Sequence, residues 1–148
     1  MHVTFPMNPM KTLLALLVVA LALPALADFP PGSPPFHKDF KSASKSAKKS
    51  GKPMILVFSA DWCPPCVMMK KDVYPNEVIK PLHDKFEWAY LDLDIDENIA
   101  LIHKYKGDPI PHFQFLDSEG NDLGGGKFQG NAKEFKAHIE GFLKKVAK

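Results

Sequence analysis

Residues 54–66 read Met-Ile-Leu-Val-Phe-Ser-Ala-Asp-Trp-Cys-Pro-Pro-Cys, an apolar run that ends in two closely spaced cysteines. Cys63 and Cys66 are the only cysteines of the chain. A disulfide that stabilises a fold usually closes a long loop, because its effect grows with the chain entropy that it removes from the unfolded state. A disulfide between Cys63 and Cys66 would remove little of this chain entropy. The pair therefore indicates redox chemistry, in which a disulfide opens and closes without moving the rest of the fold.

Two other uses of a Cys-X-X-Cys pair fit this sequence poorly. A structural zinc ion needs four ligands, and the histidines that would complete the set lack the close spacing of such sites. These histidines are His83, His103, His112 and His138. Covalent haem attachment needs a histidine directly after the second cysteine, where this chain has Val67. We therefore expect neither a metal ion nor another cofactor.

The first 27 residues predict export. Lys11 precedes an apolar run over residues 13–23 that is too short to span a bilayer comfortably, and small residues follow at 25–27. This pattern is typical of a signal peptide that is cleaved after Ala27, with a retained membrane anchor as the alternative. We expect residues 1–27 to be removed.

The 121 residues that would remain are enough for one compact domain with a buried core. The prolines and the glycine of residues 28–35 predict an extended tether, so we expect the domain to cover residues 36–148. All 19 basic residues are lysine, and 17 acidic residues nearly balance them. Because arginine, the bidentate partner of phosphate, is missing, we do not expect a nucleic acid partner.

Hydrophobic periodicity predicts helices that alternate with strands. The expected helices cover residues 36–49, the segment from the cysteine motif to a break at Pro75, residues 77–85, residues 97–105, and a last helix capped by Asn131 and Glu134. The expected strands are 54–58, 86–94, 112–116 and, after a turn at 118–121, an edge strand through Phe128. This order predicts an α/β fold with a central mixed β-sheet flanked by helices, in which the last two strands form a hairpin.

Several of these segments together resemble the thioredoxin-fold oxidoreductases. The resemblance rests on Gly51-Lys52-Pro53 before the apolar strand, on Ala60 to Cys66, on Asp94-Ile95-Asp96 and on Ile110-Pro111. The sequence is most similar to secreted bacterial members, including the periplasmic C-terminal domain of the thiol:disulfide interchange protein DsbD. The resemblance covers about residues 36–148. It implies a thioredoxin fold with an extra N-terminal helix, and a periplasmic location.

The resemblance also implies a role for each residue of the motif. Cys63 would attack a substrate disulfide, because the start of a helix lowers the pKa of a thiol. Cys66, one turn further and more buried, would resolve the mixed disulfide. Trp62 would wall one side of the site. Ile110 and Pro111, the latter matching the cis-proline of the family, would offer backbone hydrogen bonds to a substrate strand.

Two departures from the family pattern bear on the chemistry. Val57 stands where thioredoxins and many relatives carry a buried acid that helps to deprotonate the resolving cysteine. We expect Asp92 to replace it as proton acceptor, with a surface carboxylate at a strand end as the alternative. Pro64 and Pro65 have no backbone N–H and leave fewer donors for the Cys63 thiolate. We expect a Cys63 pKa nearer ~7 than ~3.5, and hence a reductant or balanced exchanger.

Two functions fit the sequence. The first is an exported, monomeric enzyme that reduces or exchanges the disulfides of protein substrates and is restored by a membrane or periplasmic redox partner. The alternative is a copper-binding or copper-delivery module. Its soft ligands for Cu(I) would come from Cys63, Cys66, Met68, Met69 and His112. Methionines just inside a helix more often pack in a core, so we favour the enzyme.

Overall fold

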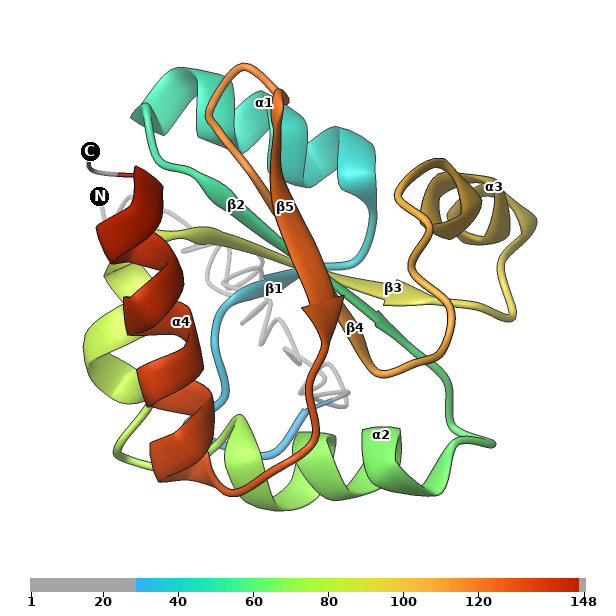
Figure 1. Cartoon of the computed structure of the whole chain (residues 1–148), viewed down its shortest axis with the longest axis vertical. Helices are drawn as coiled ribbons and strands as arrows, with labels where there is room; N and C mark the ends of the chain where they lie inside the picture. Colours follow the sequence, from blue (N-terminus) through green and yellow to red (C-terminus); the bar gives the residue numbers. More distant parts are fainter. Residues whose placement is uncertain (1–28, 147–148) are drawn as a thin grey trace, which may run out of the picture.

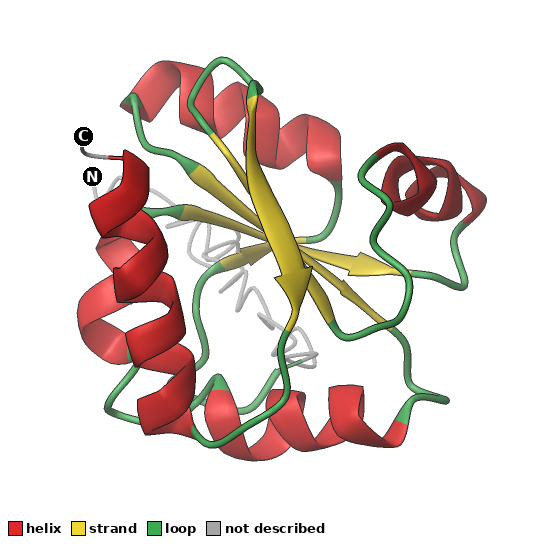
Figure 2. Cartoon of the chain, in the orientation of Figure 1, coloured by secondary structure: helices red, strands yellow, loops and turns green. Residues whose placement is uncertain are grey.

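The structure is a computed structural model that describes residues 29–146, and a five-stranded mixed sheet forms its centre (Figures 1 and 2). The strands are β1 (Phe36–His37), β2 (Met54–Ser59), β3 (Glu87–Asp92), β4 (His112–Leu116) and β5 (Asp122–Lys127), arranged in the order β1-β3-β2-β4-β5. Strands β1 and β2 run parallel to β3, whereas the pairs β2–β4 and β4–β5 are antiparallel. The predicted mixed sheet is confirmed.

Helices lie around this sheet on all sides of the view in Figure 1. The α-helices of the described residues are α1 (Phe40–Ser50), α2 (Pro64–Met68), α3 (Asp96–Lys104) and α4 (Ala132–Val146). The π-helical segment η1 (Met69–Val73) continues α2 and ends before Pro75, and the 3-10 helix η2 (Lys80–Lys85) occupies part of the helix expected at 77–85. Within residues 29–146, no helix has the length and apolar character that crossing a membrane requires.

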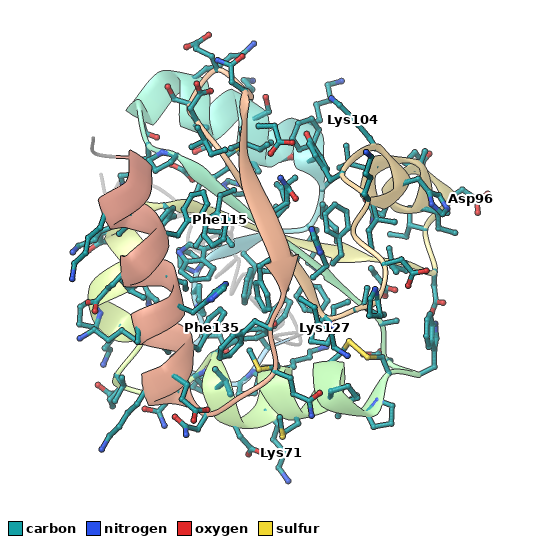
Figure 3. All side chains as sticks on the ribbon, viewed as in Figure 1. Lys71, Asp96, Lys104, Phe115, Lys127 and Phe135 are labelled. Carbon is teal, nitrogen blue, oxygen red and sulfur yellow. A yellow bond between two sulfur atoms is a disulfide. The ribbon has the colours of Figure 1, made fainter. Side chains whose placement is uncertain are left out.

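The central strand β2 contributes side chains to two hydrophobic cores, one on each face of the sheet, which explains its continuous apolar sequence. Ile55 and Val57 lie in the core that η1 and α4 cover, together with Phe115 and Phe135. Figure 3 shows Phe115 and Phe135 between the sheet and α4. The alternate residues of β2 face the other core, which α1 and α3 cover; they are Met54, Leu56 and Phe58. The predicted thioredoxin fold, a sheet with helices on both faces, is confirmed.

The N-terminal helix begins later than the predicted residue 36. Phe36 and His37 form β1 and pair with β3, where Phe36 lies opposite Trp88. Helix α1 begins at Phe40, because the Asp39 carboxylate accepts a hydrogen bond from the backbone N–H of Ser42 at 2.7 Å and caps the helix. The apolar side chain of Phe36 thus belongs to the edge of the sheet.

The segment just before β1, which the sequence predicts as a tether, contacts the domain. The ring of Phe29 lies 4.6 Å from that of Phe36 and 4.8 Å from that of Tyr90, measured between centroids, and Pro34 is buried. The predicted signal peptide, residues 1–27, lies outside the described residues. The tether and the signal peptide stay predictions.

Candidate active site

The two cysteines form a disulfide at the junction of β2 and α2 (Figure 3), with their Cα atoms 5.2 Å apart. Cys63 occupies the N-cap position of α2, and the backbone N–H of Val67 donates to its carbonyl at 3.1 Å. Cys63 is 6% exposed, whereas Cys66 is completely buried. Cys63 is therefore the more exposed of the two cysteines.

Pro64 and Pro65 occupy the first two positions of α2, which suits them because the N–H groups of a first helical turn have no partner inside the helix. Cys63 precedes them with an extended backbone, and its N–H donates to the carbonyl of Ala60 at 3.2 Å. Of the first three helical positions, only Cys66 has a backbone N–H. The Cys63 sulfur thus faces a helix start with few donors.

Trp62 lies on the surface beside this helix start, with 64% of its area exposed. Its Nε1–H donates to the Asp94 carboxylate at 2.9 Å, which ties α2 to the segment between β3 and α3. Further large hydrophobic residues are exposed on α2 (Val67 and Met68), just before α3 (Ile95) and on α3 itself (Ile99). Exposed apolar side chains of this kind are available for contact with another protein.

The fold brings Ile110 and Pro111 against the cysteines, although they are far away in the sequence. The Ile110 carbonyl oxygen lies 4.0 Å from Cys63 Sγ, and the Ile110 side chain packs against Cys63 and Cys66. The Ile110–Pro111 and Asp108–Pro109 peptide bonds are both cis. The Pro111 carbonyl accepts a hydrogen bond from the N–H of Phe128 at 3.3 Å, just after β5. This loop presents its backbone directly beside the accessible sulfur.

Asp92 ends β3 next to Ser59, its parallel partner on β2. Its carboxylate accepts a hydrogen bond from the backbone N–H of Asp94 at 2.9 Å. It also lines a surface cavity of about 300 Å³, together with Phe29, Lys38, Asp61, Lys70, Tyr90 and Ile95. The role of Asp92 as proton acceptor stays a prediction.

Sequence reasoning missed a pair of hydrogen-bonded hydroxyl groups at the end of β2. The Tyr90 hydroxyl donates to Ser59 Oγ at 2.8 Å, and Ser59 is fully buried. Burial raises the pKa of Tyr90 above its ordinary value, mainly because the phenolate would lose its hydration. Lys70 Nζ lies 5.5 Å from the Tyr90 ring and 3.8 Å from the Asp61 carboxylate. The one signal in the sequence was the alternation that places Tyr90 and Asp92 on the same face of a strand.

The soft ligands named for the copper alternative lie in different surroundings. Met69 is fully buried in the core on the α4 side of the sheet, whereas His112 lies opposite Phe58, on the α1 side. Met68 is partly exposed on α2. Across residues 29–146, no three side chains of histidine, cysteine, aspartate or glutamate are grouped to hold a metal ion.

Comparison with known proteins places residues 36–118 in the family described as Thioredoxin-like. The chain is 31% identical to the chloroplastic thioredoxin-like protein HCF164 of Arabidopsis thaliana over 81% of this chain and 48% of that protein. It is 28% identical to the thiol:disulfide interchange protein DsbD of Colwellia psychrerythraea over 68% of this chain and 17% of that protein. The chain thus spans less than half the length of these two relatives.

The solved structure of the DsbH oxidoreductase has the same fold. It matches with a TM-score of 0.66 at 22% identity, and the match covers 77% of this chain and 87% of that one. At this identity, the likeness supports the arrangement of sheet and helices.

Proposed function

Since this chain belongs to the thioredoxin-like family and its domain is that of a thiol:disulfide oxidoreductase, we propose that it reduces or exchanges the disulfides of exported proteins. One observation carries the proposal: the accessible Cys63 is joined to the buried Cys66 beside the Ile110 carbonyl. This arrangement separates an attacking sulfur from a resolving sulfur.

The reaction moves two electrons from the reduced pair to the substrate. The Cys63 thiolate attacks one sulfur of the substrate disulfide, forms a mixed disulfide and releases the other substrate sulfur as a thiolate, which takes up a proton. The Cys66 thiol then loses its proton and attacks Cys63 Sγ. The Cys63–Cys66 disulfide forms, and the second substrate thiolate leaves. Asp92 is the group that we propose to accept the Cys66 proton.

The surroundings of Cys63 favour a protein as the substrate. The loop at Ile110 and Pro111 offers backbone groups beside the sulfur, and the exposed ring of Trp62 adds an apolar surface. A reductant in an oxidising compartment must regain its electrons, so we propose a second, membrane or periplasmic redox protein as its partner. We propose that the enzyme acts as a monomer.

Export is proposed from the sequence of residues 1–27, which has the pattern of a cleaved signal peptide. The family itself does not carry a location, because one relative is chloroplastic. The secreted bacterial members that the sequence resembles favour the periplasm.

Trapping tests the proposed function directly. The reduced protein with Cys66→Ser should form a stable mixed disulfide with insulin, because Cys63 can attack and nothing resolves the product. The wild-type protein should reduce insulin with dithiothreitol as the electron source. Cys63→Ser is the matched control and should trap nothing. If Cys66→Ser forms no adduct while the protein is folded, the enzyme proposal is wrong.

The copper alternative has a separate readout. A copper-delivery module would retain Cu(I) after anaerobic loading and would leave insulin intact. The opposite sides of the sheet on which Met69 and His112 lie argue against a shared ion. We therefore expect insulin reduction without retained copper.

A further inference from the structure

A chain of three hydrogen-bonded side chains runs along β4 and β5 behind the loop that carries Ile110 and Pro111. His112 Nε2 lies 3.0 Å from Gln114 Oε1, and Gln114 Nε2 donates to the Asp122 carboxylate. His112 and Gln114 are 5% and 2% exposed. Buried polar groups destabilise a protein unless they are hydrogen-bonded, so these hydrogen bonds are part of what stabilises the sheet.

The Asp122 carboxylate at the outer end fixes the direction in which these hydrogen bonds are donated. A carboxylate only accepts, so the Gln114 amide nitrogen must face Asp122 and the amide oxygen must face His112. The Nε2 atom of His112 must therefore carry a hydrogen and donate it. The Asp122 carboxylate is held in turn by the backbone N–H of Gly124 at 2.8 Å. The imidazole is thus held in one orientation, with a hydrogen on Nε2.

Two glycines provide the space for these side chains. A Cβ atom at Gly107 would lie 2.8 Å from His112 Cδ2, so the imidazole packs directly on the backbone there. A Cβ atom at Gly125, the strand partner of Gln114, would overlap the Gln114 side-chain oxygen. On the sheet, the His112 ring lies 6.0 Å from that of Phe58, between centroids.

His112 is connected to both ends of the loop of residues 107–111. The imidazole contacts Gly107, where the loop begins, and the backbone of His112 follows Pro111, where the loop ends. In between, the Ile110 carbonyl lies 4.0 Å from Cys63 Sγ. The position of the imidazole therefore helps to set where the loop stands against the accessible sulfur.

We propose that His112 is a positioning residue for disulfide exchange. Gln114 and Asp122 hold its imidazole in place, and the imidazole in turn braces the loop of residues 107–111 in the position at which a protein substrate docks beside Cys63. The inference rests on the proposed function, because it concerns protein disulfides. A small disulfide can reach Cys63 without the loop. Loss of the brace should therefore raise the KM for a protein substrate and leave the reaction with a small disulfide unchanged.

The test compares insulin with glutathione disulfide as substrates of the whole protein. Gln114→Met removes both hydrogen bonds at nearly constant volume and should raise the KM for insulin about tenfold, because the buried Nε2–H of His112 loses its one acceptor. Its rate with glutathione disulfide should stay that of the wild type. Asp122→Ala cuts the chain at its exposed end without opening the core and should raise the same KM to a smaller extent.

Two further variants separate positioning from general stability. His112→Leu should raise the KM for insulin. His112→Gln keeps a donor toward Gln114, so its KM for insulin should stay close to that of the wild type. His103→Leu, on the exposed surface of α3, is the control and should behave as the wild type. The positioning role of His112 would be wrong, and the proposed function would stand, in either of two cases. In the first, the variants impair the reactions with insulin and with glutathione disulfide equally. In the second, Gln114→Met and Asp122→Ala leave the KM for insulin unchanged. A wild-type protein that reduces neither substrate would overturn the proposed function, and the brace with it.

Discussion

The side chain of Val57 is fully buried in the core under η1 and α4, at the position where thioredoxins hold an acid. The next residue on the same face of β2 is Ser59, whose hydroxyl accepts a hydrogen bond from Tyr90. Burial raises the pKa of Tyr90 above its ordinary value, so this hydroxyl pair stays neutral at physiological pH. A proton acceptor for Cys66 must come from another group, and Asp92 is the carboxylate at the end of β3 beside Ser59.

Substitution of this carboxylate tests its role. Asp92→Asn should slow the resolution of the mixed disulfide by about tenfold or more and move its rate profile to higher pH, because general base catalysis would be lost. Stopped-flow measurement of the reduced protein against a small disulfide over a range of pH values checks this. Asp72→Asn, on the exposed surface of η1, is the control. An unchanged rate and profile would make Asp92 a surface carboxylate only.

The motif residues of the site could be predicted because they are close together in the sequence or match a specific family pattern. Cys63, Cys66 and Trp62 form one local segment, so they could be named as candidates from the sequence alone. The hydrogen bonds of Trp62 to Asp94 and of Tyr90 to Ser59 could not be predicted. Each joins residues more than thirty positions apart, and strand register, which depends on the whole sheet, brings them together.

At the scale of single elements, capping decided which helix boundaries were predicted correctly. The last helix was expected to carry a capping box, and the structure shows both of its bonds: Asn131 N–H to the Glu134 carboxylate at 2.9 Å, and Glu134 N–H to Asn131 Oδ1 at 3.0 Å. The first helix was placed too early, because apolar spacing from Phe36 onward continues the helical pattern through β1. Asp39, with Ser42 three residues later, was the overlooked start signal.

The Asp39 cap has a measurable effect on stability. Asp39→Ala should lower the free energy of unfolding by about 1 kcal/mol, because the backbone N–H of Ser42 loses its acceptor. The hydrogen bond from that N–H lowers the pKa of Asp39 below 3.8. The stabilisation from a lowered carboxyl pKa is fully present when the pH is above the pKa of Asp39 in the unfolded chain. It disappears as the pH falls through the pKa of Asp39 in the folded protein.

Urea unfolding at several pH values measures this contribution. The difference between the wild type and Asp39→Ala should be constant above about pH 5 and should shrink in more acidic solution. Asp39→Asn, which keeps an acceptor without the charge, should lie closer to the wild type and lack the acid-dependent part. A difference that does not change with pH would show that the carboxylate charge contributes nothing to the cap.

At the scale of the whole molecule, the five apolar residues of β2 predicted a sheet buried on both faces, and the two cores confirm it. The strand order could not be read in the same way. Strand β1 has only two residues and was predicted as part of a helix, whereas β5, with three consecutive glycines, was predicted as an edge strand from the turn at residues 118–121. Both lie at the edges of the sheet, where neighbouring strands rather than local sequence decide the pairing.

The redox state of the cysteines should change the stability of the whole fold. The folded chain favours the disulfide over the dithiol when it stabilises the Cys63 thiolate weakly, and by the thermodynamic cycle the oxidised protein is then the more stable form. Pro64 and Pro65 leave Cys66 as the only residue with a backbone N–H in the first three positions of α2. The oxidised protein should therefore unfold at a higher guanidinium concentration than the reduced protein.

The few backbone donors at the start of α2 also predict a low reduction potential. A glutathione or dithiothreitol titration should give a value nearer ~−270 mV than ~−120 mV, the range of reductants rather than of strong oxidants. Pro65→Ala restores one N–H at the start of α2, so it should lower the Cys63 pKa, raise the potential and narrow the stability difference between the two forms. Pro81→Ala makes the same change at the exposed start of η2 and should leave all three unchanged. A reduced protein that is more stable than the oxidised protein would identify a strong oxidant, because only a well-stabilised thiolate makes the dithiol the favoured form.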